Sequence, residues 1–154
     1  MTRFVKFTAA ALGLTMLSGA AFADGHIDAA IKARQSQMQL YAFNLGTLGA
    51  MAKGQMDYDA AKASGAANNL VALSMMDQSL MWPQGSDSGS ANSRAKAEIW
   101  ANFPDVMAKG KAFADAAATM QTAAGTDLDA LRGAMGALGA SCGGCHKPYR
   151  APAN

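Results

Sequence analysis

The sequence predicts an all-α protein, an antiparallel up-down-up-down four-helix bundle. Its 154 residues fit a single domain. The chain is rich in alanine, methionine, glycine and leucine and poor in β-branched and aromatic residues, which favours helix over strand. Four stretches have a helical pattern, most of them with apolar residues at alternating steps of four and three, and no stretch alternates with period two. Four helices with short connections form such a bundle.

The first 23 residues have the pattern of a secretory signal peptide, so they do not enter the predicted fold. Arg3 and Lys6 make the start positive, Phe7–Leu17 is an apolar run too short to span a bilayer, and Ala21–Ala23 is an A-x-A cleavage signal. Cleavage would leave a mature domain of residues 24–154, exported to the periplasm. No later segment is long and apolar enough to cross a membrane, so we expect no stable membrane insertion.

The mature domain is expected to be electrically neutral. Removing Arg3 and Lys6 from the 13 basic residues leaves 11, which balance the 11 acidic residues. No segment of the sequence concentrates lysine and arginine, so we expect no nucleic-acid partner. The sequence also has no paired-carboxylate cleft, no nucleophile with its base and no phosphate loop, so we do not expect an enzyme.

The first two predicted helices cover roughly residues 27–53 and 57–80. Gly54 ends the first, whose apolar seam consists of Ile27, Ile31, Arg34, Met38, Tyr41, Leu45, Leu48 and Ala52. Asp57 is the predicted N-cap of the second helix. Its less regular inner face is predicted to consist of Tyr58, Ala61, Gly65, Leu73 and Met76. The following segment, Trp82–Ser90, has the composition of a loop.

The third helical region covers roughly residues 93–123 and is divided by Pro104. We expect a short helix through Asn102 and a fresh start with Pro104 in its first turn. The seam of this region consists of Ile99, Phe103, Val106, Gly110, Phe113, Ala117 and Met120.

The fourth predicted helix covers residues 126–149, behind a capping box formed by Thr126 and Asp129. Its seam passes through both cysteines of the chain and consists of Leu128, Leu131, Met135, Leu138, Cys142, Cys145 and Tyr149. The cysteines should therefore face the interior of the bundle, near the end of its last helix.

The two cysteines stand in a Cys-x-x-Cys-His motif made by Cys142, Cys145 and His146. This is the pattern of c-type haem attachment. Two thiols three residues apart on a helix share one face, so they can bond to both vinyl groups of one porphyrin. The adjacent imidazole can then bind the iron. One motif predicts one haem c, attached through two thioethers.

Other interpretations of the motif have less support. A thioredoxin-like redox pair would open a helix in a βαβ context, whereas this pair lies at a helix end and no strand is predicted. A structural zinc site needs four ligands, and His26 is the only histidine or cysteine outside the motif, so the chain has too few. A helical interaction module without cofactor would be colourless, and it leaves the coincidence of motif, seam and export signal unexplained.

The mature chain resembles the class II c-type cytochromes, the family of cytochrome c′, along its whole length. The matching segments are ARQSQM (33–38), MAKGQMDYDA (51–60), SRAKAEIW (93–100) and CGGCHKPYR (142–150). The position of the motif near the C-terminus is distinctive, since class I cytochromes carry it near the N-terminus. The resemblance implies a four-helix bundle in which Cys142 and Cys145 bind haem covalently and His146 is the proximal ligand of the iron.

The resemblance also implies roles for polar residues around the haem. Arg34 and Gln35 are expected near the haem propionates, and Arg94 is expected to border a propionate. Arg34 has independent support, because it lies on the seam of the first helix, where a charge is costly unless it is paired. Arg150 matches a basic position of the family on the proximal side, although a cation there also suits the helix dipole.

By the same resemblance, Met38 faces the open side of the iron. If its thioether ligates the iron, the Met/His pair is that of an electron-transfer cytochrome. If Met38 only packs in the core, the iron stays five-coordinate and can bind nitric oxide or carbon monoxide. We favour ligation, and with it a periplasmic one-electron carrier that serves redox partner proteins. The family further implies a homodimer formed through the first two helices.

Overall fold

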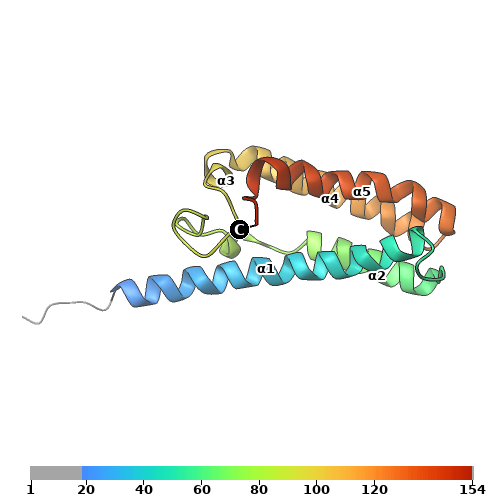
Figure 1. Ribbon diagram of the computed structural model, residues 1–154, viewed down its shortest axis with the longest axis horizontal. Helices are drawn as coiled ribbons and strands as arrows, with labels where there is room; N and C mark the ends of the chain where they lie inside the picture. Colours follow the sequence, from blue (N-terminus) through green and yellow to red (C-terminus); the bar gives the residue numbers. More distant parts are fainter. Residues whose placement is uncertain (1–18, 154) are drawn as a thin grey trace, which may run out of the picture.

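The computed structural model describes residues 19–153, and four long helices make up its bundle (Figure 1). These helices are α1 (Gly19–Ala52), α2 (Ala60–Ser74), α4 (Phe103–Ala124) and α5 (Leu128–Tyr149). Two one-turn elements lie between α2 and α4, the 3-10 helix η1 (Ser79–Met81) and α3 (Glu98–Ala101). The predicted all-α bundle is confirmed. The break at Pro104 is confirmed as well, because this proline lies in the first turn of α4.

Each long helix packs against two others. Helix α1 contacts α2 and α5, and α4 contacts the same two, so the four helices close a ring. Short connections join α1 to α2 and α4 to α5 at one end of the bundle (Figure 1). The long connection from α2 to α4 lies at the opposite end, beside the C-terminus, and α1 extends past it (Figure 1). One end of the bundle is therefore compact, while the other is built from irregular segments.

The hydrophobic core is concentrated toward the end with the short connections. Its largest fully buried apolar side chains are Leu48, Met51, Leu70, Met120, Leu131 and Leu138. Burying a side chain of this size contributes about 1.5–3 kcal/mol to folding. Alanines 63, 67, 117 and 124 are also fully buried, and their small side chains let the helices approach closely. This core stabilises the bundle and leaves the region around the Cys-x-x-Cys-His motif less completely filled.

Helices α2 and α5 are capped by Asp59 and Asp127, two aspartates other than the predicted caps. Asp59 and Asp127 each have extended backbone angles, and each side chain accepts the backbone N–H three residues on. The predicted caps at Asp57 and Thr126 are wrong. Several neighbouring residues have side chains that can cap a helix, and the cap is the one whose backbone is extended where the helix begins. The Thr126 hydroxyl instead donates to the Thr122 carbonyl of α4.

The buried face of α2 also differs from the predicted one. Helix α2 ends at Ser74, and the residues that it buries are Ala63, Ala66, Ala67 and Leu70. Ala61 and Gly65 are exposed, and Met76 lies beyond the helix and is exposed too. The physical reason is that α2 packs against both α1 and α4, and its alanine-rich face permits the closest approach to them.

Helix α1 buries two amides that the predicted seam omitted. The Nε2 of Gln37 donates to the carbonyl of Leu73 in α2 at 2.9 Å. Asn44 is also buried, and its Oδ1 accepts from Nδ2 of Asn69 in α2 at 3.0 Å. These bonds tie α1 to α2. They rotate α1 so that Met38, which was predicted to lie on the seam, keeps 39% of its surface exposed.

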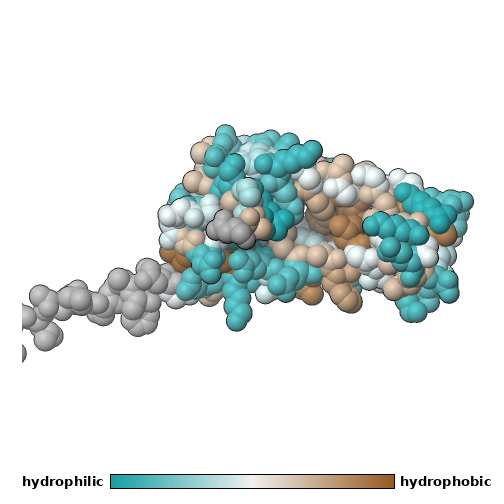
Figure 2. Space-filling view, viewed as in Figure 1, coloured by the Kyte–Doolittle hydropathy of each residue, from teal (hydrophilic) through white to brown (hydrophobic). Residues whose placement is uncertain are grey.

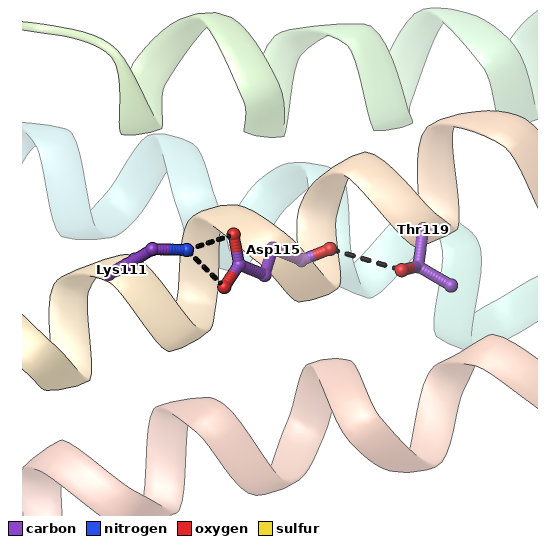
Figure 3. A network of polar contacts seen from close by, with 3 residues as sticks. All are labelled: Lys111, Asp115 and Thr119. Carbon is purple, nitrogen blue, oxygen red and sulfur yellow. Dashed lines mark hydrogen bonds and ion pairs between the residues drawn. The ribbon is translucent and has the colours of Figure 1, made fainter.

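The outer face of α4 carries an exposed polar ladder (Figure 3). The Nζ of Lys111 donates to both carboxylate oxygens of Asp115 at 2.9 and 2.7 Å, and the Thr119 hydroxyl donates to the Asp115 carbonyl at 3.1 Å. Exposed pairs at this spacing contribute only about 0.3–0.5 kcal/mol. The ladder therefore marks the solvent side of α4 and adds little to the stability of the bundle.

The predicted signal peptide falls mostly outside the described residues. Residues 1–18 lie outside them, and residues 19–23 belong to the first turns of α1. Cleavage before residue 24 stays a prediction. Within residues 19–153, none of the helices combines the length and apolar character that a membrane span needs.

Candidate haem-attachment site

The two cysteines lie on α5, between Leu138, the last buried residue that this helix gives to the main core cluster, and the buried Tyr149. Both thiols are free and half-buried. Burial raises the pKa of the Cys145 thiol, and the negative charge of Asp105 raises it further. Cys142 makes one weak contact, 3.5 Å from its Sγ to the Leu138 carbonyl oxygen. Two thiols on one helix face are what attachment to a single porphyrin requires.

Two other helices contribute an aromatic pair, and one of its members, Tyr41, lies close enough to Cys142 for their charges to interact. Tyr41 of α1 meets Phe113 of α4 edge to face, with ring centroids 4.7 Å apart and an interplanar angle of 67°. Burial is the larger cause that raises the pKa of Tyr41 to about 12, and the charge of Cys142 adds to it. Figure 2 shows apolar surface in a hollow between α1 and α5. These surfaces suit a flat, largely apolar group bonded to α5.

The hydrogen bonds next to the aromatic pair are incomplete. Gln37 donates from Nε2 to the Tyr41 hydroxyl at 3.1 Å, but its own buried Oε1 has no partner. It is the only buried side-chain polar atom in that state within residues 19–153. An unpaired buried acceptor costs about 1–3 kcal/mol. This cost falls beside Tyr41, one member of the aromatic pair, so the polar contacts there leave an acceptor that a bound group can use.

His146 follows Cys145 on the last turn of α5 and is partly exposed. Partial burial lowers the pKa of its imidazole, and the positive charges of Arg150 and Arg94 lower it further. A neutral imidazole is the form that binds a metal, because one ring nitrogen keeps its lone pair. The electrostatics of this end of α5 thus favour the ligand form of His146.

The end of α5 is fixed by pairing with a segment before α3. The backbone N–H of Lys96 donates to the Tyr149 carbonyl at 3.0 Å, and the backbone N–H of Ala151 donates to the Arg94 carbonyl at 2.8 Å. The Arg94 side chain donates from Nε to the Ala151 carbonyl at 2.9 Å. These bonds hold the residues just after His146, so they also set the direction in which the last turn of α5 points.

Tyr149, which the helical pattern predicts only as an apolar seam residue, anchors the same turn to α4. Its hydroxyl donates to Oδ2 of Asp105 at 2.7 Å. This hydrogen bond is the main cause that raises the pKa of Tyr149 to about 12. Nothing in the local sequence indicates the pair, because the two residues are 44 positions apart in the chain.

Arg34 is buried, as its place on the predicted seam suggested, but its partners come from the loop between α2 and α4. Its Nη1 donates to the Met81 carbonyl at 3.0 Å and to the Ser86 hydroxyl at 2.7 Å. Its Nη2 donates to the Ser86 carbonyl and to the Ser93 hydroxyl. Its guanidinium also lies 4.7 Å from the ring centroid of Trp82. The burial lowers the pKa of Arg34.

The remaining predicted site residues are distributed around this loop. Gln35 is exposed on α1, one residue beyond Arg34. The Ser93 hydroxyl accepts a hydrogen bond from Arg34, and Ser93 directly precedes Arg94 in the chain. Arg34 and Arg94 therefore lie in the same region. Met38 lies one turn further along α1 and outside the buried core. No group of three or more histidine, cysteine or acidic side chains gathers as a metal cluster in the described part of the chain.

The fold and the site together define a class of protein: a four-helix bundle with a c-type haem motif at the end of its last helix. The comparison with known families agrees. Residues 29–150 match the Cytochrome C′ family, and the chain belongs to it. Members of this family carry one covalent haem c, and this chain has two cysteines, so one haem c is its cofactor.

Several proteins show the extent of the similarity. Cytochrome c-554 of Cereibacter sphaeroides is 46% identical over 125 residues, which cover 80% of this chain and 94% of that protein. A solved cytochrome c′ from Rhodobacter is 37% identical with a TM-score of 0.80, covering 82% of this chain and 98% of the other. A ferrous variant of Alcaligenes xylosoxidans cytochrome c′ with bound nitric oxide is 34% identical with a TM-score of 0.72, covering 82% and 97%.

Proposed function

We propose that this protein is a periplasmic electron carrier, with haem attached to Cys142 and Cys145 and with iron ligated by His146 and Met38. The observation that carries the proposal is the position of Met38. It lies on α1, one turn from the buried Arg34, yet it is 39% exposed and takes no part in the core. Its thioether is therefore available as a ligand. Bound haem supplies a one-electron couple between ferric and ferrous iron, and a Met/His pair raises its potential.

In this proposal the residues of the chain hold and insulate the haem. The two thioethers fix it to α5, and Tyr41 with Phe113 offers it an aromatic surface. Arg34 uses four of its five N–H donors on the loop, which leaves its Nε–H for a propionate. Gln35 and Arg94 are the other proposed propionate neighbours. Because the loop already holds Arg34, haem binding requires little reorganisation there.

Replacing Met38 by alanine tests the iron ligation. If Met38 ligates the iron, the visible spectrum of the holoprotein changes from low-spin six-coordinate to high-spin, and the reduction potential falls. Met56→Ala is the matched control, because Met56 is similarly exposed, at 44%, and lies beyond the far end of α1. A wild-type spectrum that is already high-spin and five-coordinate would contradict the proposed ligation.

The second candidate function is binding of a small gas such as nitric oxide or carbon monoxide. Two observations favour it: the exposed side chain of Met38 is not locked by packing, and a solved relative holds nitric oxide. This function predicts rapid binding of carbon monoxide by the wild-type ferrous protein, followed as a spectral change. If Met38 ligates the iron, binding is slow in the wild type and fast in Met38→Ala.

The periplasmic location rests on the signal-peptide pattern of the first 23 residues. We expect the purified protein from a periplasmic extract to begin at Asp24. N-terminal sequencing and the intact mass with one haem check this, and a retained N-terminus at Met1 would contradict it.

A further inference from the structure

We propose that four cations next to the haem motif form a docking surface for the acidic face of an electron-transfer protein. This surface, the basic rim, consists of Arg94, Lys96, Lys147 and Arg150. The inference rests on the proposed electron-carrier function and adds the chemistry of its partner.

The fold creates the rim by joining two segments that are far apart in the sequence. Residues 94–96 pair with residues 149–151 in an antiparallel bridge between Ala95 and Arg150. The Nζ of Lys96 also donates to the Pro148 carbonyl at 3.0 Å. Lys147 is exposed on the last turn of α5. Arg150, the first residue after the helix, is also exposed. Each segment contributes only two cations, so no basic cluster is visible in the sequence.

The rim has an excess of positive charge in a mature chain with 11 basic and 11 acidic residues. The two segments themselves carry no carboxylate, and the only ion pair made by a rim cation within the described residues joins Lys96 to Glu98 at 3.8 Å. Other acidic groups at this end have partners of their own: Asp105 accepts from Tyr149 and lies 3.7 Å from Lys109, and Asp87 accepts from the backbone N–H of Gly89. Lys147 directly follows His146, and Arg150 lies four residues after His146, so the positive charge of the rim lies beside the proposed iron ligand.

The position of the rim favours a redox protein over an anionic bilayer. A partner that docks on the rim comes close to Cys145 and His146, where an electron has the shortest way to the haem. Complementary charge speeds such encounters and falls off with salt. Binding to a bilayer surface commonly uses an amphipathic helix with cations on its polar face. The rim cations instead come from two segments joined by an irregular bridge.

The first experiment measures oxidation of the ferrous holoprotein by ferricyanide, a trianion that stands in for an acidic face. We expect the bimolecular rate constant to fall as salt rises, although the mature chain has no net charge. Lys147→Glu should lower the rate at low salt roughly fivefold. Lys53→Glu, with the same charge change at the opposite end of the bundle, should lower it much less. Equal effects of the two substitutions on the rate would contradict the proposal that the basic rim is the docking surface.

The second experiment needs no electron transfer, so it separates the rim from the proposed function. Titration with hexacyanocobaltate(III), a redox-inert trianion, should shift the amide resonances of residues 94–96 and 147–151 in the holoprotein, and Lys147→Glu should abolish the shifts. Resonance shifts confined to other residues would contradict the proposal that the anion binds at the basic rim. Failure of ferricyanide to oxidise the protein, with the shifts intact, would count against the carrier function alone. Sedimentation with phosphatidylglycerol vesicles that is lost in Lys147→Glu would assign the rim to a membrane and overturn the protein partner.

Discussion

At the scale of single residues, the buried charge of Arg34 shows how an isolated cation is tolerated inside a helical bundle. A buried charge is costly unless it is paired and hydrogen-bonded. No carboxylate pairs with Arg34 within the described part of the chain. Instead, two carbonyls, two hydroxyls and the face of Trp82 compensate it. In return, Arg34 fixes the loop between α2 and α4 against α1.

Replacing Arg34 should therefore destabilise the protein through the loop. We expect Arg34→Ala to lower the free energy of unfolding by about 3 kcal/mol, since it removes several hydrogen bonds to a charged group and leaves buried Ser86 without its donor. Arg34→Lys keeps the charge but loses the planar fork, so its loss should be about half as large. Urea denaturation measures both. Lys32→Ala, an exposed position on the same helix, should change stability little.

Two tyrosines near the haem motif predict a loss of stability at high pH. The pKa values of Tyr41 and Tyr149 are raised from 10.0 to about 12 in the folded protein, so the folded state holds these protons more tightly. Their stabilisation is complete below pH 10 and is lost as the pH rises from 10 to 12. The urea midpoint measured across this window should fall less in a Tyr41→Phe, Tyr149→Phe double variant. An identical fall in both proteins would contradict the assignment.

At the scale of elements, the helix boundaries depend on single capping contacts. Asp59 and Asp127 each accept one backbone N–H, at 2.9 and 2.8 Å. The backbone hydrogen bond with Lys62 is the main cause that lowers the pKa of Asp59. Its stabilising effect is thus present above the ordinary pKa of an aspartate and is lost as the pH falls below it.

Substitutions at these caps test the boundaries directly. We expect Asp59→Ala and Asp127→Ala each to cost about 1 kcal/mol of stability in urea denaturation at neutral pH. Asp57→Ala and Thr126→Ala, at the positions that the sequence pattern favoured, should each cost clearly less. A larger cost for Asp57→Ala than for Asp59→Ala would show that α2 begins earlier than residue 60.

At the scale of the whole molecule, the outer face of α1 and α2 carries a groove that suits a second copy of the chain. The groove holds about 410 Å³. Its lining residues are Phe43, Asn44, Thr47, Met56, Lys62, Gly65, Ala66 and Asn69. Phe43 is 73% exposed and Met56 is 44% exposed, and both line the groove, so it presents a combined apolar surface. We propose a homodimer through this face.

A charge placed in the groove should separate the dimer. We expect Phe43→Glu to shift the mass measured by size-exclusion chromatography with light scattering from dimer to monomer, with the haem spectrum unchanged. Leu80→Glu is the control, because Leu80 is equally exposed, at 78%, but lies outside the groove. A wild-type protein that stays monomeric at high concentration would refute the homodimer.

The fold class, the covalent cofactor and the family follow from local features of the sequence. Helical periodicity needs only local spacing, and the Cys-x-x-Cys-His motif concentrates its chemistry in five adjacent residues, from Cys142 to His146. The break at Pro104 was predictable for the same reason, since proline acts on its own backbone. The burial of Arg34 followed from its place on a helical seam.

The contacts that join distant segments depend on the tertiary fold. The rotation of α1, which buries Gln37 and leaves Met38 exposed, follows from bonds to α2 across roughly 30 residues of chain. The loop that surrounds Arg34, the bond between Tyr149 and Asp105, and the basic rim are all products of chain topology. A seam pattern specifies a helix face only to within about one residue, because each residue turns the helix by 100°. Contacts with the neighbouring helices therefore determine which of two adjacent faces of a helix is buried.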